Sequence, residues 1–175
     1  MKPVSCKALH LALSVIKANM EIHWQWYTFE EFSVQELYAI LVLRQQVFIV
    51  EQECAYLDCD GLDQCAWHLV GWRKTEKRRR PLAYLRVILP KSEGEIPVIG
   101  RLLTHKEIRG KGIGGTILAQ AMQRIKDFMP GAAIRISAQY YLLSFYEGFG
   151  FSPASEIYAE DGIPHIAMIH TPYEQ

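Results

Sequence analysis

Four glycines and two basic residues occupy the segment RGKGIGG at residues 109–115, and an apolar helical repeat follows it directly. Apolar side chains recur there at the spacing of one helix face, and Pro130-Gly131 ends the pattern. The apolar positions are Ile113, Ile117, Leu118, Ala121, Ile125 and Phe128. The sequence therefore predicts a glycine loop and then a helix from about Ile113 to Phe128 that packs one face against another layer of the fold.

The glycines at 110, 112 and 115 match the G-x-G-x-x-G pattern of dinucleotide-binding proteins, but the surrounding sequence does not. In those proteins the first glycine follows its strand directly, and an acidic residue lies about 20 residues further on. Here residues 105–109 separate the preceding strand from Gly110, and the later position falls on residues 135–137, which are Arg, Ile and Ser. A P-loop is excluded because no G-K-[ST] ends the run.

The loop is better suited to a different phosphate group. Successive backbone N–H groups can converge where a helix begins, and the helix dipole favours an anion at that end. Arg109 and Lys111 add positive charge. The sequence therefore predicts a pyrophosphate cradle without a dinucleotide scaffold, the alternative being a glycine-rich turn that serves only to reverse the chain.

The other elements follow from periodicity, caps and turn residues. Strands are expected at residues 22–26, 66–72, 82–89, 97–104, 133–138 and 165–170, and the other helices at 33–48 and 139–148. Ser33 and Glu36 form a capping box, residues 51–65 read as an acidic loop, and the basic segment 73–81 reads as a hairpin turn. This order predicts an α/β or α+β sheet with helices on its faces.

Length and charge limit the number of domains and the kinds of partner. The chain has 175 residues, and 19 basic residues balance 19 acidic ones, so no overall field draws it to nucleic acid or to a membrane. We expect one domain at residues 21–172 after an N-terminal extension at 1–20, with Met20 as an alternative start. The run Arg78 to Arg80 reads as a solvated loop tip rather than a nucleic-acid site.

The four cysteines are too few for a disulfide framework and indicate a reducing compartment, the cytoplasm. Cys54, Cys59, Cys65 and His68 lack a C-x-x-C pair, so we expect no metal site. The sequence is compatible with a homodimer but does not fix the oligomeric state.

Two ordered motifs resemble those of the GNAT N-acetyltransferases. The pattern R/Q-x-x-G-x-G/A is present as Arg109, Gly112 and Gly114, and the pattern Y-x-x-x-G-F as Tyr146, Gly150 and Phe151. The segments LRQQVFIVEQECAYLDCDGLD, IGRLLT, SAQYYLLSFYEGFGF and EDGIPHIAM further resemble the ElaA-type subgroup, in order, over about residues 21 to 170.

The resemblance implies a mixed, mostly antiparallel sheet that is splayed between its fourth and fifth strands. Acetyl-CoA would enter that opening, with its pantetheine paired to the backbone of residues 101–104 like an added strand. The implied cofactor-binding residues are Leu102, Leu103, Thr104, Arg109, Gly110, Lys111, Gly112, Ile113, Gly114, Gly115 and Tyr146. Tyr146 is also placed to protonate the departing CoA thiolate, the alternative being a tyrosine that only packs.

The acceptor is expected to be a primary amine, whose pKa near 10.4 means that it must lose a proton before attack. A base contributes roughly 10² to 10⁴ in rate. The candidates are Glu51, Asp58, Asp60, Glu160, Asp161 and His165. Glu51 ranks first because it follows the first helix, in a segment that borders the acceptor site in these folds; capping or pairing with Arg44 is its alternative.

The sequence thus predicts an acetyl-CoA-dependent N-acetyltransferase. A non-catalytic acyl-CoA-binding regulatory module is the alternative from another class, because it would keep the loop and need neither the base nor Tyr146. RQQVFIVEQ also distantly resembles acyl-homoserine-lactone synthases, but the loop favours a CoA thioester over an acyl-carrier donor.

Overall fold

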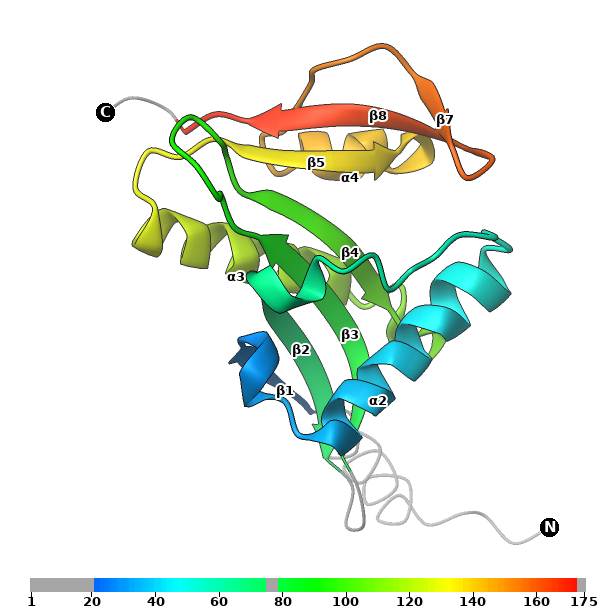
Figure 1. The fold of residues 1–175 in the computed structure, drawn as a ribbon. Helices are drawn as coiled ribbons and strands as arrows, with labels where there is room; N and C mark the ends of the chain where they lie inside the picture. The colour runs from blue at the N-terminus through cyan, green and yellow to red at the C-terminus, as the bar shows by residue number, and fades with distance from the viewer. Residues whose placement is uncertain (1–20, 75–78, 173–175) are drawn as a thin grey trace, which may run out of the picture.

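The described residues form one eight-stranded sheet, in the order β1-β2-β3-β4-β5-β8-β6 with β7 paired to β8 (Figure 1). The computed structural model describes residues 21–74 and 79–172. The strands are β1 (Ile22–Tyr27), β2 (Ala66–Lys74), β3 (Arg79–Ile88), β4 (Val98–Thr104), β5 (Ile134–Gln139), β6 (Ser152–Pro153), β7 (Tyr158–Glu160) and β8 (Ile163–His170). Neighbouring strands are antiparallel except β4 and β5, which are parallel. The predicted mixed, mostly antiparallel sheet is confirmed.

The helices are α2 (Val34–Arg44), α3 (Ile113–Phe128) and α4 (Leu143–Glu147), with shorter helical turns η1 (Phe29–Glu31), η2 (Gln45–Glu51), η3 (Asp63–Cys65), η4 (Lys106–Ile108) and η5 (Tyr140–Leu142). The predicted capping box opens α2, because the Ser33 hydroxyl accepts from the Glu36 N–H and the Glu36 carboxylate accepts from the Ser33 N–H. α2 continues into η2, a π-helical turn that carries the helix to Glu51. The helix therefore runs three residues beyond the predicted end at 48.

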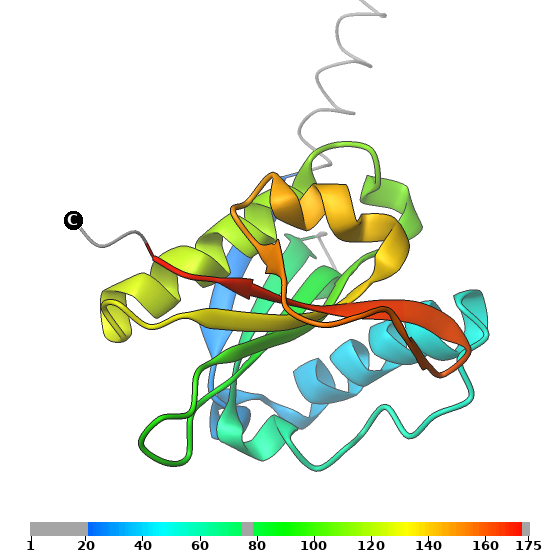
Figure 2. The same ribbon diagram turned by 90° about the horizontal axis from the view of Figure 1, so that it is seen from above.

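Helices cover both faces of the sheet. α3 and α4 lie on one face and α2 on the other (Figure 2). Successive residues of β3 serve the two sides: Leu85 belongs to the core under α3, and Tyr84 belongs to the core under α2. Each fully buried Leu or Ile in these layers stabilises the fold by roughly 1.5–3 kcal/mol.

The predicted face of α3 is largely confirmed. Ile117, Leu118, Ala121 and Ile125 are buried, whereas Phe128 is 63% exposed, so its assignment to the core was wrong. Its ring instead packs edge-on against Trp67, with centroids 5.2 Å apart, and under the guanidinium of Arg124. The end of α3 thus covers a surface cluster of Trp67, Arg124 and Phe128, while Ile125 one turn earlier still packs in the core.

The sheet splits between β4 and β5. Their pairing is limited to Val98 with Arg135 and Ile99 with Ile136. Beyond this point β4 contains a bulge opposite β3, and Arg101 within it adopts a positive φ of 52°. A bulge bends its strand and increases its twist, so the rest of β4 diverges from β5. The splay expected between the fourth and fifth strands is thus present.

Several features differ from the sequence-based expectations. β6 and β7 were not predicted, because strands of two and three residues show no measurable alternation. β2 extends to Lys74 and β3 begins at Arg79, so both ends of the predicted turn 73–81 belong to strands. Residues 75–78 lie outside the described part of the chain, as do residues 1–20 with the expected extension and alternative start.

Candidate active site

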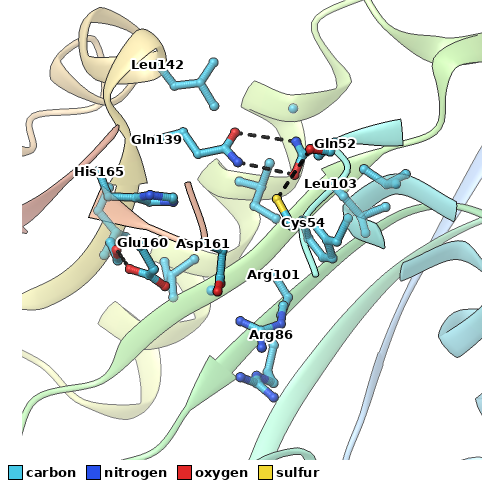
Figure 3. Close-up of a pocket in the computed structure, with 18 of the residues that line it drawn as sticks. Gln52, Cys54, Arg86, Arg101, Leu103, Gln139, Leu142, Glu160, Asp161 and His165 are labelled. Atoms are coloured by element: carbon cyan, nitrogen blue, oxygen red, sulfur yellow. Dashed lines mark hydrogen bonds between the residues drawn. The ribbon is translucent and has the colours of Figure 1, made fainter. Parts of the chain in front are cut away.

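The diverging strands open a cavity of about 660 Å³ lined from η2, β4, the glycine loop, α4 and the β7–β8 hairpin (Figure 3). The predicted site residues that line it are Glu51, Leu102, Leu103, Thr104, Arg109, Gly114, Tyr146 and His165, together with the candidate bases Glu160 and Asp161. The predicted loop residues Gly110, Lys111, Gly112, Ile113 and Gly115 are not part of its lining. The fold therefore brings the candidate catalytic groups and one end of the glycine loop to the same cavity.

The glycine loop has the backbone shape of an anion cradle. Gly110 and Gly112 adopt positive φ angles of 71° and 76°, which side-chain-bearing residues rarely adopt. Gly112 is the N-cap of α3, and no side chain caps this helix. The first N–H groups of α3 therefore have no side-chain capping partner. The positive end of the dipole of this 16-residue helix lies at the same glycine loop.

The two basic side chains of the loop are both engaged. Lys111 donates from Nζ to the carbonyl of Glu107 at 2.8 Å. Arg109 donates from Nε to the Thr104 carbonyl at 3.0 Å and from Nη1 to the Glu51 carboxylate. The hydrogen bond from Arg109 lowers the pKa of Glu51 below its ordinary value. Glu51 thus pairs with the glycine loop rather than with Arg44.

Neighbouring glycines at the start of α3 serve different purposes. A Cβ placed on Gly114, which lines the cavity, would meet nothing closer than Phe145 Cζ at 3.9 Å. A Cβ on Gly115 would lie 3.1 Å from Phe149 Cζ. Gly114 therefore keeps the cavity open, and Gly115 lets α3 approach the aromatic residues of the α4 region.

The hydroxyl of Tyr146 is held without a protein partner. Tyr146 lies on α4, is only 7% exposed and lines the cavity. Its ring packs edge-on against Phe145 and Phe151. Within residues 21–74 and 79–172 its hydroxyl makes no hydrogen bond, and burial raises its pKa to about 12. The phenol is therefore protonated at neutral pH and available to a ligand as a donor.

His165 presents one ring nitrogen to the cavity. Its Nδ1 lies 2.9 Å from the carbonyl oxygen of Ile163, which can only accept, so Nδ1 carries the hydrogen. In the neutral ring Nε2 then holds the lone pair. The ring stacks on Tyr158 with centroids 6.3 Å apart, which fixes its orientation on β8.

Asp58 and Asp60, two further candidate bases, are engaged in ion pairs. Asp58 accepts from Arg44 Nε at 2.8 Å and from Arg101 Nε at 2.7 Å. Asp60 accepts from both terminal nitrogens of Arg86, at 2.6 and 2.7 Å. Burial alone would raise the pKa of Asp60, but the bonds from Arg86 and the nearby charges lower it to about 2. These carboxylates anchor the acidic loop to the sheet.

The buried centre of this network is Arg44, the last residue of α2. Arg44 is 1% exposed and donates to Asp63 Oδ1 at 2.8 Å as well as to Asp58. The Tyr84 hydroxyl donates to His68 Nδ1 at 2.7 Å, and His68 Nε2 donates to the Asp63 carbonyl at 2.9 Å. Burial lowers the pKa of His68, which is therefore neutral.

Sequence patterns did not identify Gln52 and Gln139, a pair of glutamines that spans the cavity. Gln139 Nε2 donates to Gln52 Oε1 at 3.3 Å, and Gln52 Nε2 donates to Gln139 Oε1 at 3.5 Å (Figure 3). The Tyr141 hydroxyl also donates to Gln139 Oε1, at 2.7 Å. Gln52 follows η2 and Gln139 ends β5, so the amides join the end of the α2–η2 helix to β5 across the cavity. No local pattern could have found a contact between residues 87 positions apart.

Two alternative readings of the sequence gain no support from the geometry. In the run of arginines, Arg79 pairs with Glu36 and Arg80 pairs with Glu107, while Arg78 lies outside the described residues. Both ring nitrogens of His68 are engaged, by the Tyr84 hydroxyl and the Asp63 carbonyl, so neither is available to a metal. Among the described helices, none has both the length and the apolar character needed to cross a bilayer.

Comparison with known proteins agrees with this geometry. Residues 76–172 match the acetyltransferase (GNAT) domain. Protein ElaA of Escherichia coli is 39% identical over 149 residues, covering 84% of this chain and 95% of ElaA. Its crystal structure superimposes with a TM-score of 0.79 at 38% identity and covers 86% of this chain and 99% of that chain.

Solved structures of other acyltransferases share the fold. An acyl-CoA N-acyltransferase from Pseudomonas aeruginosa gives a TM-score of 0.80 at 36% identity and covers 86% of this chain and 100% of its own. A CoA-dependent acyl-homoserine lactone synthase, BjaI, gives 0.68 at 13% identity, over 85% of this chain and 82% of its own, which is a likeness of fold alone. With its sheet split at β4 and β5, its glycine loop at the start of α3 and its kinship to ElaA, this chain belongs to the GNAT acetyltransferase family.

Proposed function

We propose that the protein transfers an acetyl group from acetyl-CoA to a primary amine, by direct attack of the amine on the thioester in a ternary complex. The family supplies the acyltransferase chemistry. The observation that carries the proposal is Tyr146, a largely buried residue that lines the cavity beside the unpaired part of β4 and whose hydroxyl has no partner among the described residues.

The split sheet supports the assignment of the cofactor position. Past Ile99, the edge of β4 that faces β5 has no strand partner in the described structure, so residues 101–104 can pair with the amides of a pantetheine chain as with an added strand. The diphosphate would then lie against the N–H groups at the start of α3. Gly110, Lys111, Gly112, Ile113 and Gly115 would hold it through their backbone, and Arg109 through its guanidinium.

The acceptor amine must lose a proton as it attacks the carbonyl carbon. The geometry favours His165 as the base, because Nε2 carries a lone pair while Nδ1 is held by Ile163. Glu51 is a weaker candidate in the free protein, since its carboxylate is paired with Arg109 and its pKa is lowered. A carboxylate with a lowered pKa is a poorer proton acceptor.

As the tetrahedral intermediate collapses, the C–S bond breaks and the sulfur takes the bonding electrons. Tyr146 would donate its phenolic proton to that sulfur. A pKa raised to about 12 by burial keeps the phenol protonated beforehand, which a general acid requires. The acetyl group leaves on the amine nitrogen, and free CoA thiol is the second product.

One assay tests the proposal: release of CoA thiol from acetyl-CoA by the purified protein, measured against a broad panel of amines. Steady release that depends on the amine, with the acetylated amine found by mass spectrometry, is expected. Cofactor binding without release for every amine would favour the non-catalytic acyl-CoA-binding module. Including S-adenosylmethionine in the panel tests the relation to acyl-homoserine lactone synthases.

The setting of this activity is also a proposal. We place it in the cytoplasm because Cys54, Cys59 and Cys65 are all free thiols in the structure, which suits a reducing compartment.

A further inference from the structure

The charges that line the cavity are not all compensated. Arg86 and Arg101 are paired with aspartates of the acidic loop, and Arg109 is paired with Glu51. Two lining carboxylates, Glu160 and Asp161, have no cationic partner within residues 21–74 and 79–172. The cavity therefore carries surplus negative charge. This surplus charge lies on the β7–β8 hairpin.

The hairpin places these carboxylates by a tight turn. Glu160 pairs with Ile163, so Asp161 and Gly162 form a two-residue turn, and both have positive φ, 50° and 80°. Such turns match the twist of the flanking strands. The charge of Asp161, second to burial, raises the pKa of the Cys54 thiol on the opposite wall, so Asp161 acts across the cavity. Figure 3 shows its carboxylate between Glu160 and Cys54.

One carboxylate oxygen of Glu160 accepts a hydrogen bond, and the other accepts none from the described residues. The Ser137 hydroxyl donates to Glu160 Oε2 at 2.9 Å, and the Tyr158 hydroxyl donates in turn to Ser137 Oγ at 2.7 Å. Tyr158 also carries the stacked ring of His165. Tyr158 thus supports both the Glu160 carboxylate and the ring of His165, the proposed base. The other carboxylate oxygen, Glu160 Oε1, makes no protein hydrogen bond in the described structure.

A second polar group of the cavity lining, on α4, is available to a ligand. Tyr146 is more than nine-tenths buried, and its hydroxyl lines the cavity with no partner in the described chain. The hydroxyl is therefore free to donate its hydrogen to water or to a substrate that enters the cavity. The surplus carboxylates then set the charge of the part of that substrate beside the hairpin.

We propose that the acceptor is a dication: one amino group attacks the thioester while a second, protonated amino group is bound by Glu160 and Asp161. An ammonium satisfies Glu160 Oε1 and Asp161 by charge-assisted hydrogen bonds. An acceptor with a carboxylate at that position is repelled. The inference rests on the proposed N-acetyltransferase activity, whose acceptor class it specifies.

The test compares three acceptors of equal chain length: diaminobutane, butylamine and aminobutyrate, with diaminopropane to diaminohexane as a length series. We expect kcat/KM for the preferred diamine to exceed that of its matched monoamine at least about 10-fold, as for one charge-assisted contact, and the amino acid to be poorest. In the double variant Glu160→Gln, Asp161→Asn the ratio of diamine to monoamine should fall toward one. The control Glu156→Gln, an exposed carboxylate outside the cavity lining, should keep the wild-type ratio.

Equal kcat/KM for diamines and monoamines in the wild type, or an unchanged ratio in the double variant, overturns the inference. Failure of the proposed function would look different, because no amine would release CoA thiol. In that case calorimetry with CoA-saturated protein tests the dicationic acceptor by binding alone. A diamine should bind about 10-fold tighter than the monoamine, and equal binding refutes the dicationic acceptor. Melting curves of both variants establish that they fold.

Discussion

Glu51 and Arg109, 58 residues apart in the chain, form an ion pair that ties the end of η2 to the glycine loop. The first prediction concerns this pair. In Glu51→Gln the amide oxygen still accepts from Arg109, so kcat should stay within a few-fold of wild type, and KM for acetyl-CoA should change by no more than about 5-fold, the range of an exposed ion pair. Steady-state kinetics with a Glu53→Gln control measures this. If turnover instead fell by about 100-fold or more, Glu51 would be the base.

His165→Asn should separate the two ring nitrogens. The Asn amide can replace the Nδ1 donor to Ile163 but offers no counterpart to Nε2. We expect kcat at neutral pH to fall about 100-fold, with KM for acetyl-CoA little changed. The deficit should shrink as the pH rises, because a larger fraction of the amine is then already deprotonated. A variant with wild-type kcat at neutral pH would show that His165 only supports the hairpin.

Tyr146→Phe keeps the ring and removes only the hydroxyl. Because that hydroxyl has no partner in the described structure, the melting temperature should be preserved. As the general acid, its loss should lower turnover about 100-fold, with KM for acetyl-CoA nearly constant. Burial raises the pKa of this phenol to about 12, so we expect it to stay protonated across the pH range of the assay. Wild-type kcat in the variant excludes the phenol from catalysis.

Gly114→Val tests the cofactor cavity without backbone strain. Gly114 lies in helical geometry, and its Cβ position is open toward the cavity. A branched side chain there should raise KM for acetyl-CoA about 10-fold or more, while the fold survives. Ala119→Val, on an exposed turn of the same helix, controls for the helix propensity of valine. Equal KM values in the two variants would remove Gly114 from the cofactor site.

The buried histidine predicts a pH dependence of stability. Burial lowers the pKa of His68 in the folded protein below 6.5, so the unfolded chain binds the proton more tightly. Stability from this group is therefore present above pH 6.5 and is lost as the pH falls below it. Denaturant unfolding at pH 7.5 and 5.5 should differ by up to about 1.3 kcal/mol from this residue. His68→Gln should reduce this difference in unfolding free energy. Part of the difference should remain, because the pKa of His105 is lowered too. The control His23→Gln, at an exposed position, should leave the difference unchanged.

Much of this fold could be predicted, because local patterns carry it. The apolar repeat of α3 and the capping box of α2 act within a few residues, so their prediction needs no tertiary information. Arg44 shows the limit of periodicity: it occupies a buried position of α2, but its partner aspartates lie 14 and 19 residues away in an irregular loop. Strands as short as β6 are fixed only by β8 beside them.

The site was predicted less completely than the fold. Motifs located the glycine loop and Tyr146, because their spacing is local. The choice among candidate bases depends on which carboxylates meet an arginine, and those contacts arise only when α2, β3 and β4 assemble. The bridge between Gln52 and Gln139 depends on the divergence of β4 from β5, which a bulge at Arg101 produces and residue pattern does not encode.

The acidic loop between η2 and β2 is fastened by charge rather than by apolar packing. Three arginines from α2, β3 and β4 hold Asp58, Asp60 and Asp63. A loop grafted from a relative would leave buried guanidinium groups unpaired, at a cost of several kcal/mol, unless its aspartates fall in the same positions. Swapping this wall of the cavity between family members to alter specificity therefore means transplanting loop and arginines together, as a single cassette.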